Sequence, residues 1–297
     1  MQLEKKQATK NYYEKYPMIE GGASRIKWWQ EYLTLFLPDD MIKGRLIGEI
    51  GSGIGEMARG LINRGARMVC LDLTMAALRR NQEINPEAEL FYGSALELPF
   101  ADETFDHTMS LGVLHHTPDC RKGIKEISRV TAPGGIVVLY IYSYWSILNL
   151  AYSLFRPITK MIPLESVPDT IVNMLQPFAK SHLNQTLNEH QLRRLLGDKL
   201  WTPQCTFHTL GEIRKWGAEE GLTMTKYKRF YLGYANVMAF KKSGIQRTEP
   251  AEEVKLRCIK CGHFPLSKSE EGCSCEKCGA EFKKEEGIYR FLSSKLI

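Results

Sequence analysis

A glycine-rich loop at residues 51–55 constrains the fold of this chain more than any other stretch. The apolar run Leu-Ile-Gly-Glu-Ile at 46–50 leads into the loop, in which Gly51, Gly53 and Gly55 alternate with other residues. An apolar run that ends in such a loop predicts a strand, a tight turn and then a helix. Glycine tolerates positive φ and lets a ligand approach the bare backbone, so we expect the loop to bind a ligand.

The loop differs from two common phosphate-binding loops. A dinucleotide-binding loop reads Gly-x-Gly-x-x-Gly, and this chain has Glu56 where the third glycine would fall. A P-loop needs Lys-Ser or Lys-Thr after the glycines, and neither pair follows here. Glu49, just before the loop, favours a cationic ligand over a pyrophosphate.

Four more segments follow in a regular order. They are an apolar run that ends at Asp72, the segment 90–100 with Gly93 and Ser94, the segment 105–119 with His115 and His116, and the segment 130–140 with Pro-Gly-Gly. Alternating strands and helices predict a parallel sheet with helices on both faces. Ligands bind such sheets at the carboxyl ends of the strands, where the glycine loop, Asp72, Ser94 and the histidine loop all fall.

The pattern Glu49-x-Gly51-x-Gly53-x-Gly55 and these four segments resemble the class I S-adenosylmethionine-dependent methyltransferases over roughly residues 45–142. The subgroup resembled includes ubiquinone and menaquinone C-methyltransferases and many small-molecule methyltransferases. The resemblance implies an α/β, Rossmann-like, doubly wound fold with a seven-stranded sheet and with S-adenosylmethionine as cofactor. The cofactor contacts that it implies are Tyr12, Tyr16, Glu49, Gly51, Ser52, Gly53, Gly55, Asp72, Leu73, Ser94, Ala95, Leu111 and His116.

One position departs from the family's pattern. The family usually has an acid after the glycine of the third segment, where it reaches the adenine amino group, and this chain has Ser94. A serine accepts a hydrogen bond but carries no charge. The alternative adenine contact is the backbone of Ala95 and Leu96.

Catalytic residues are only weakly indicated. Methyl transfer is an in-line displacement, in which an enzyme acts mainly by positioning donor and acceptor, and a general base is needed only if the acceptor loses a proton. His115 and His116 are candidates because their loop lies beside the expected methyl group. The alternative is that they only shape the loop. Other residues expected near the cavity are Tyr142, Tyr144 and His208.

Four regions make up the predicted domain organisation. Residues 1–40 form a helical lid, 41–242 the methyltransferase domain, 243–254 a linker and 255–297 a small C-terminal domain. In the lid, Tyr12, Tyr13 and Tyr16 are expected to cover the cofactor or substrate. The aromatic residues expected to pack on the sheet instead are Trp28, Trp29 and Phe36.

A helical insertion is predicted at residues 143–208. Apolar residues recur at helical spacing from Ile147 to Ile158, and a second apolar helix is expected from Ile171 to Phe178. In the family resembled, an insertion here usually builds the substrate cap. The alternatives are that the helices enlarge the core, form a dimer face or dock on a membrane surface.

The C-terminal domain carries a second strong pattern. Cys258 and Cys261 form one Cys-x2-Cys pair, and Cys275 and Cys278 form another thirteen residues later. Four thiolates at this spacing suit a closed, tetrahedral structural zinc site, whose metal would supply the folding energy of so small a domain. The spare residue Cys273 is the alternative to Cys275. The domain resembles the zinc-ribbon family that activates tRNA and protein methyltransferases as a separate subunit.

The composition indicates the class of protein and its compartment but does not identify the methyl acceptor. The chain has 297 residues, 43% of them hydrophobic and 25% charged, and a formal net charge of +6 that does not by itself imply nucleic acid. We expect no signal peptide and no transmembrane span. Eight cysteines, five of them near one end, do not suggest a secreted disulfide framework, so a reducing cytoplasm is expected.

Three functions remain open. The first is methyl transfer to a small-molecule or lipid-like acceptor, with peripheral membrane contact left open. The second is RNA base methylation with the ribbon as binding module, although the ribbon lacks a dense basic run. The third is a non-catalytic cofactor-binding scaffold, which Ser94 supports and the intact Glu49 and Asp72 oppose. The oligomeric state is not predicted.

Overall fold

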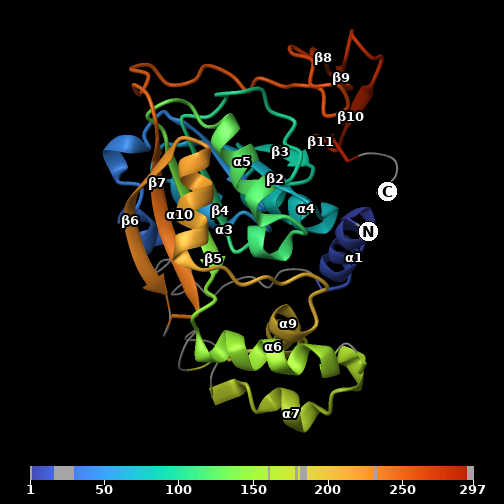
Figure 1. Cartoon of the computed structure of the whole chain (residues 1–297). Coiled ribbons are helices and arrows are strands. Elements are labelled where there is room, and N and C mark those ends of the chain that lie inside the picture. Colours follow the sequence, from blue (N-terminus) through green and yellow to red (C-terminus); the bar gives the residue numbers. More distant parts are fainter. Residues whose placement is uncertain are drawn as a thin grey trace.

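A twisted sheet with helices on both faces forms the body of the protein (Figure 1). The computed structural model describes residues 2–16, 30–159, 161–177, 180, 186–230 and 233–292. Its main strands are β1 (Leu46–Ile50), β2 (Arg67–Asp72), β3 (Glu89–Tyr92), β4 (His107–Leu111), β5 (Ile136–Tyr142), β6 (Leu222–Phe230) and β7 (Ala235–Lys242). The helices are α1 (Gln2–Lys15), α3 (Glu56–Ile62), α4 (Met75–Ile84), α5 (Cys120–Val130), α6 (Ile147–Thr159), α7 (Asp169–Asn173), α9 (Glu189–Leu200) and α10 (Leu210–Glu219).

The strand order confirms the predicted doubly wound fold. The sheet runs β6-β7-β5-β4-β1-β2-β3, with β1 to β5 parallel and β7 antiparallel to both of its neighbours, β5 and β6. Two buried apolar layers cover its faces, one including α5 and α10 and the other including α3 and α4. Helix α10 begins with a capping box, in which Thr209 and Glu212 each satisfy a backbone N–H of the other.

The C-terminal ribbon continues this sheet, which the sequence did not predict. Strand β11 (Ile288–Arg290) pairs parallel with β3, and β10 (Glu281–Glu285), β9 (Gly272–Ser274) and β8 (Ser267–Ser269) follow. The ring of Tyr289 stacks on Phe91 with centroids 5.1 Å apart, and Phe282 stacks on Phe291 at 4.4 Å. The ribbon and the methyltransferase-like body therefore share one apolar core.

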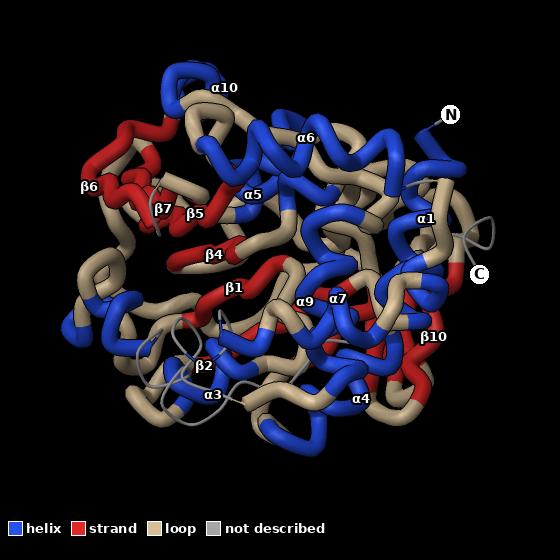
Figure 2. The backbone as a smooth tube through the Cα atoms, turned by 90° about the horizontal axis from the view of Figure 1, so that it is seen from below, coloured by secondary structure: helices blue, strands red, loops and turns tan. Residues whose placement is uncertain are grey.

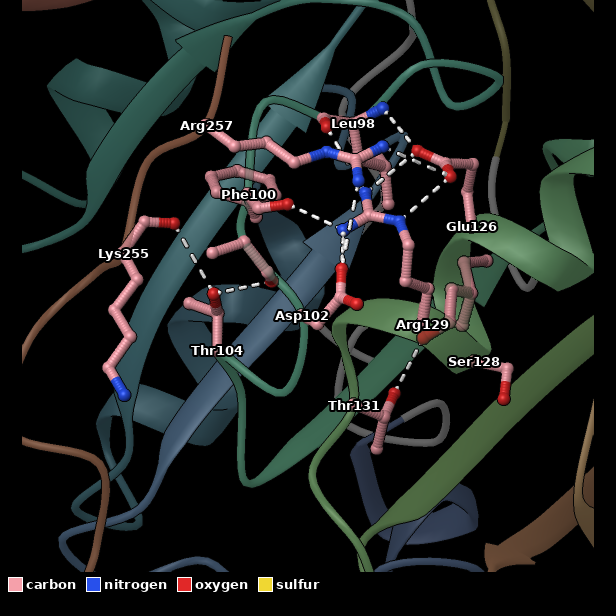
Figure 3. Close-up of polar contacts among 12 residues, drawn as sticks. Leu98, Phe100, Asp102, Thr104, Glu126, Ser128, Arg129, Thr131, Lys255 and Arg257 are labelled. Atoms are coloured by element: carbon pink, nitrogen blue, oxygen red, sulfur yellow. Dashed lines mark hydrogen bonds and ion pairs between the residues drawn. The ribbon is translucent and has the colours of Figure 1, made fainter. Parts of the chain in front are cut away.

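A polar network also joins the two parts (Figure 3). The guanidinium of Arg129 donates to Glu126 and Asp102 at 2.9 Å and to the carbonyl of Phe100 at 2.7 Å. Arg257, at the start of the ribbon, lies 3.7 Å from the same two carboxylates. Burial would raise the pKa of Glu126, but its hydrogen bonds with Arg129 outweigh this and lower it. The pair therefore stays charged.

The segment predicted to be a linker lies along the body. The N–H of Ala251 donates to Asp106, and Arg67 donates to the carbonyl of Ala251 at 2.7 Å. Val254 is buried. These contacts hold the connection to the ribbon in place.

The insertion forms a helical cap at the end of the molecule opposite the ribbon (Figure 1). Seen from that end, α6, α7 and α9 lie in front of the sheet (Figure 2). In the described part of the chain, no helix is both long enough and apolar enough to cross a membrane. Phe36 is buried in the core as predicted, whereas Trp28, Trp29 and Phe178 lie outside the described residues.

Candidate functional site

A cavity of about 290 Å³ lies at the carboxyl ends of the parallel strands, covered by α1 and α9. Seven of the predicted cofactor contacts line it: Gly51, Asp72, Leu73, Ser94, Ala95, Leu111 and His116. Six lie outside its lining: Tyr12, Tyr16, Glu49, Ser52, Gly53 and Gly55. The strand ends therefore bring together the motifs that the sequence singled out.

The glycine loop turns as tightly as its sequence predicts. Gly51 has φ +79°, and an added Cβ would lie 2.3 Å from a methyl group of Val113. Gly55 has φ +77°, and its Cβ would lie 2.1 Å from the side-chain oxygen of Asn81. Larger residues do not fit at either position.

Two buried asparagines hold the loop, and the sequence reading missed both. Asn85 donates to the carbonyl of Gly55 at 2.9 Å and to Asn81 at 2.8 Å. Asn81 donates to the hydroxyl of Ser52 at 3.2 Å. Both asparagines are fully buried and lie four residues apart, Asn81 on α4 and Asn85 as the C-cap of that helix. The spacing of two polar residues on an otherwise apolar helix face was the available signal.

Asp72 links the glycine loop to the turn after β2. Its carboxylate accepts hydrogen bonds from the N–H of Gly53 at 2.8 Å, and from the N–H and hydroxyl of Thr74 at 2.9 and 2.8 Å. Burial raises the pKa of Asp72, and these hydrogen bonds act against that shift. The carboxylate is thus held rigidly at the edge of the cavity.

Glu49 is buried inside β1, with its side chain 3% exposed. Burial raises the pKa of its carboxyl from 4.5 to about 8. One of its oxygens has no hydrogen-bond partner among the described residues. Glu49 therefore places a buried carboxyl with a raised pKa beneath the loop, and this carboxyl does not line the cavity.

A pH dependence of stability follows from Glu49. The folded chain binds one more proton than the unfolded chain between pH 4.5 and about 8, so stability falls as pH rises through this window. We expect Glu49→Gln to raise the free energy of unfolding above pH 8 by on the order of 3 kcal/mol relative to the wild type. Thermal unfolding across pH measures this. Glu87→Gln, at an exposed position, is the control. If the stability of Glu49→Gln changed with pH as steeply as that of the wild type, the prediction would be wrong.

Ser94 lies at the end of β3 and is 8% exposed. Its hydroxyl accepts the N–H of Leu96 at 3.3 Å. Ser94, Ala95 and Leu96 all line the cavity. Two alternative adenine contacts were predicted from the sequence, Ser94 and the backbone of Ala95 and Leu96. Both lie in the same part of the cavity wall.

The two candidate histidines have different surroundings. His116 lines the cavity, and its Nδ1 lies 2.8 Å from the carbonyl of Gln204. His115 is fully buried beneath it and stacks on Tyr142, with ring centroids 3.6 Å apart. His115 therefore packs beneath the loop, and His116 is the one of the two histidines that lies in the cavity wall.

Helix α1 presents one face to the cavity. Lys6, Thr9 and Tyr13 have the spacing of a single helix face, and all three line the cavity. Tyr12 is buried behind them, and Tyr16 bonds to Glu165 on the cap. Of the three tyrosines expected in the lid, Tyr13 lies in the cavity wall, together with Lys6 and Thr9, which were not predicted from the sequence.

The cap contributes a partly buried ion pair. Arg194 on α9 donates to Asp198 at 3.0 Å, one helical turn away. The hydroxyls of Tyr13 and Tyr142 lie 3.4 and 3.3 Å from the Asp198 carboxylate. The Nε of Arg194 is buried and has no hydrogen-bond partner among the described residues. A charged, incompletely satisfied cluster therefore faces the predicted cofactor contacts across the cavity.

Four cysteines of the ribbon meet at one point. The sulfurs of Cys258, Cys261, Cys275 and Cys278 all lie within 4.8 Å of one another. Two of the sulfur–sulfur distances are 3.6 Å, close to the distance of about 3.8 Å between ligands in a tetrahedral site with Zn–S bonds of about 2.3 Å. Cys273 lies outside the cluster, so the cluster uses Cys275, as the spacing favoured.

Comparison with known proteins identifies the central part of the chain. Residues 48–139 match the protein family described as a methyltransferase domain. The demethylmenaquinone methyltransferase of Thermobifida fusca is 32% identical over 139 residues, 44% of this chain and 58% of the relative. The ubiquinone/menaquinone biosynthesis C-methyltransferase of Paracoccus denitrificans is 30% identical over 50% of this chain and 60% of the relative. The chain thus spans about three-fifths of these relatives' length.

A solved structure confirms the fold. The magnesium protoporphyrin IX methyltransferase of Synechocystis PCC 6803, crystallised with S-adenosylhomocysteine, superposes with a TM-score of 0.54. The match covers 80% of this chain and 100% of that chain at 12% sequence identity. At this identity the likeness concerns the fold alone.

Proposed function

Because residues 48–139 form a class I S-adenosylmethionine-dependent methyltransferase domain, we propose that the chain transfers a methyl group from S-adenosylmethionine to a small-molecule or lipid-like acceptor. The observation that carries the proposal is the cavity itself. Asp72 and Ser94 lie in its lining with the Arg194–Asp198 pair, so donor and acceptor sites share one space.

The cofactor end of the cavity fits S-adenosylmethionine. The Asp72 carboxylate would accept the two ribose hydroxyls, and Ser94 with the backbone of Leu96 would hold the adenine edge. Gly51 allows close approach of the ligand to the backbone, and Leu73 and Leu111 supply apolar walls. When bound, the cofactor supplies an electrophilic methyl group. The protein's part is to hold the acceptor in line with it.

The acceptor end favours a ring that bears a hydroxyl. Tyr13, Tyr142 and His116 provide aromatic walls, and Asp198 provides a proton acceptor among them. Arg194 donates a hydrogen bond to that carboxylate, and its Nε offers a further donor to an oxygen of the acceptor. The names of the two relatives, which act in quinone biosynthesis, support a phenol or hydroquinone as acceptor.

Asp198→Asn tests the acceptor end. We expect kcat/KM to fall about 100-fold, because the amide cannot take the proton that a phenol loses, while cofactor affinity stays within about twofold. The assay follows labelled methyl transfer to a demethylated quinol. The matched control is Asp169→Asn on the cap, whose carboxylate pairs with Arg193 outside the cavity. Equal loss in both variants, or none in Asp198→Asn, would refute the assignment.

An RNA acceptor predicts a different result in the same assay. Transfer to tRNA should then exceed transfer to the quinol and should fall steeply with salt, because bound phosphates release counterions. A flat salt response with a preference for the quinol is what the proposed function predicts.

We also propose that the four ribbon cysteines hold one structural Zn²⁺. All four ligand positions would be filled by protein sulfurs, which suits a structural rather than a catalytic metal. The distances of the cluster and the small size of the ribbon support this assignment.

A further inference from the structure

In helix α6 of the cap two polar side chains are buried and several apolar side chains are exposed, the reverse of an ordinary surface helix. Asn149 is 1% exposed and donates to the carbonyls of Ser143 and Tyr234, both at 2.7 Å. Arg156 is 8% exposed and donates to the carbonyl of Thr202 at 2.6 Å. These hydrogen bonds attach the helix to the body, together with Tyr152, which packs against the core.

The apolar side chains of α6 point outward instead. We call them the cap surface: Ile147, Leu150, Leu154, Phe155, Ile158 and, just after the helix, Met161. Each is between 55% and 88% exposed. Met174, after the short helix α7, is 77% exposed. Helices α6 and α7 lie at the same end of the molecule (Figure 1). A contiguous exposed apolar surface of this kind marks an interaction site.

The charges around the cap surface favour a negatively charged partner. The carboxylates nearest in sequence, Glu165 and Asp169, are neutralised by ion pairs with Lys15 and Arg193. At the start of α6, exposed Arg229 donates to the carbonyl of Trp145 at 2.8 Å. Lys226 and Lys228 are also exposed on this edge strand, β6, but their amines contact the carbonyl of Leu35 and the ring of Tyr32 rather than the cap. The cation at the edge of the cap surface is therefore Arg229.

We propose that the cap surface docks on an anionic phospholipid bilayer. An apolar helix face flanked by the cation of Arg229 and by exposed Tyr144 and Trp145 is the arrangement of helices that lie in the membrane interface. A second copy of the chain is disfavoured, because the pairing of two cap surfaces would bring their cationic edges together. The proposal goes beyond the proposed function and does not depend on it.

Docking would place the cavity close to the lipid. Helix α6 contacts α9, and α9 carries Arg194 and Asp198 in the cavity wall. Helix α6 would then lie between the bilayer and α9, which forms part of the acceptor end. A lipid-like acceptor would then have a short path from the membrane to the site.

Vesicle flotation of the full chain tests this proposal. We expect the protein to float with vesicles of phosphatidylcholine and phosphatidylglycerol, and about tenfold less with phosphatidylcholine alone. Leu154→Ser combined with Phe155→Ser should lower binding at least about tenfold. The matched control is Ile245→Ser, which removes a 93% exposed apolar side chain far along the chain from the cap and should leave binding unchanged.

Two further measurements distinguish docking on a bilayer from formation of a dimer and from unfolding of the double variant. Trp145 fluorescence should shift to the blue with anionic vesicles, and Trp145→Phe should lose that shift. Calorimetry with S-adenosylhomocysteine in the absence of vesicles shows whether the double variant is folded, and its result tests the proposed function separately. Absence of vesicle binding, equal binding by the double variant, or a dimer that this variant dissociates would each overturn the proposal.

Discussion

Replacing Asp72 with alanine is expected to weaken S-adenosylmethionine binding by at least about tenfold. The change removes the carboxylate proposed to hold the ribose hydroxyls, and a hydrogen bond to a charged group contributes about 1.5–3 kcal/mol. It also removes the acceptor for Gly53 and Thr74, so the glycine loop loses one of its connections to β2 and keeps the hydrogen bonds of Gly51 and Ser52 to the carbonyl of Leu71. Isothermal titration calorimetry measures the dissociation constant directly.

Two other variants make this result specific. Asp39→Ala removes an exposed carboxylate that pairs with Arg64 away from the cavity, and should bind the cofactor normally. Asp72→Asn keeps the shape and can still accept hydrogen bonds without the charge, so we expect an intermediate loss. Unchanged affinity in Asp72→Ala would refute the proposed cofactor site.

Removal of the zinc is expected to destabilise the whole chain. Cys275→Ser should lose the metal and lower the free energy of unfolding on the order of 3–5 kcal/mol, because metal binding supplies the folding energy of small domains. The effect should reach the body, since β11 extends the sheet at β3 and Phe291 lies in the common core. Metal analysis and thermal unfolding, with Tm lower by about 10 °C, check both parts.

Cys273→Ser is the matched control for the zinc site. Cys273 is 5% exposed but lies outside the four-sulfur cluster, so this variant should keep about one zinc per chain. Loss of zinc from Cys273→Ser, or full retention in Cys275→Ser, would contradict the ligand set. An unchanged Tm in zinc-free Cys275→Ser would contradict the coupling between ribbon and body.

Local sequence patterns predicted the features that depend on local structure. The glycine loop, the acid at the end of β2 and the Pro-Gly-Gly turn are short motifs whose backbone geometry determines their residues. Alternation of strands and helices then led to the parallel order of β1 to β5, which the sheet confirms. The cysteine spacing led to the cluster for the same reason, since four ligands at one point require two close pairs.

Contacts between distant segments were not predictable in this way. The pairing of β11 with β3 joins residues about two hundred positions apart, and both edges look like ordinary short strands. The Arg194–Asp198 pair has the i, i+4 spacing of a common surface ion pair, and only the packing of α9 over the cavity buries it. The periodicity of α6 predicted a helix but not that its apolar face would point outward.

A crystal structure of the full chain with S-adenosylhomocysteine tests the central claim most directly. The account predicts density for the ligand in the cavity, with the ribose at Asp72, the adenine at Ser94 and Leu96, and the sulfur directed toward His116 and Asp198. Density at another place, or an empty cavity at a saturating ligand concentration, would contradict it.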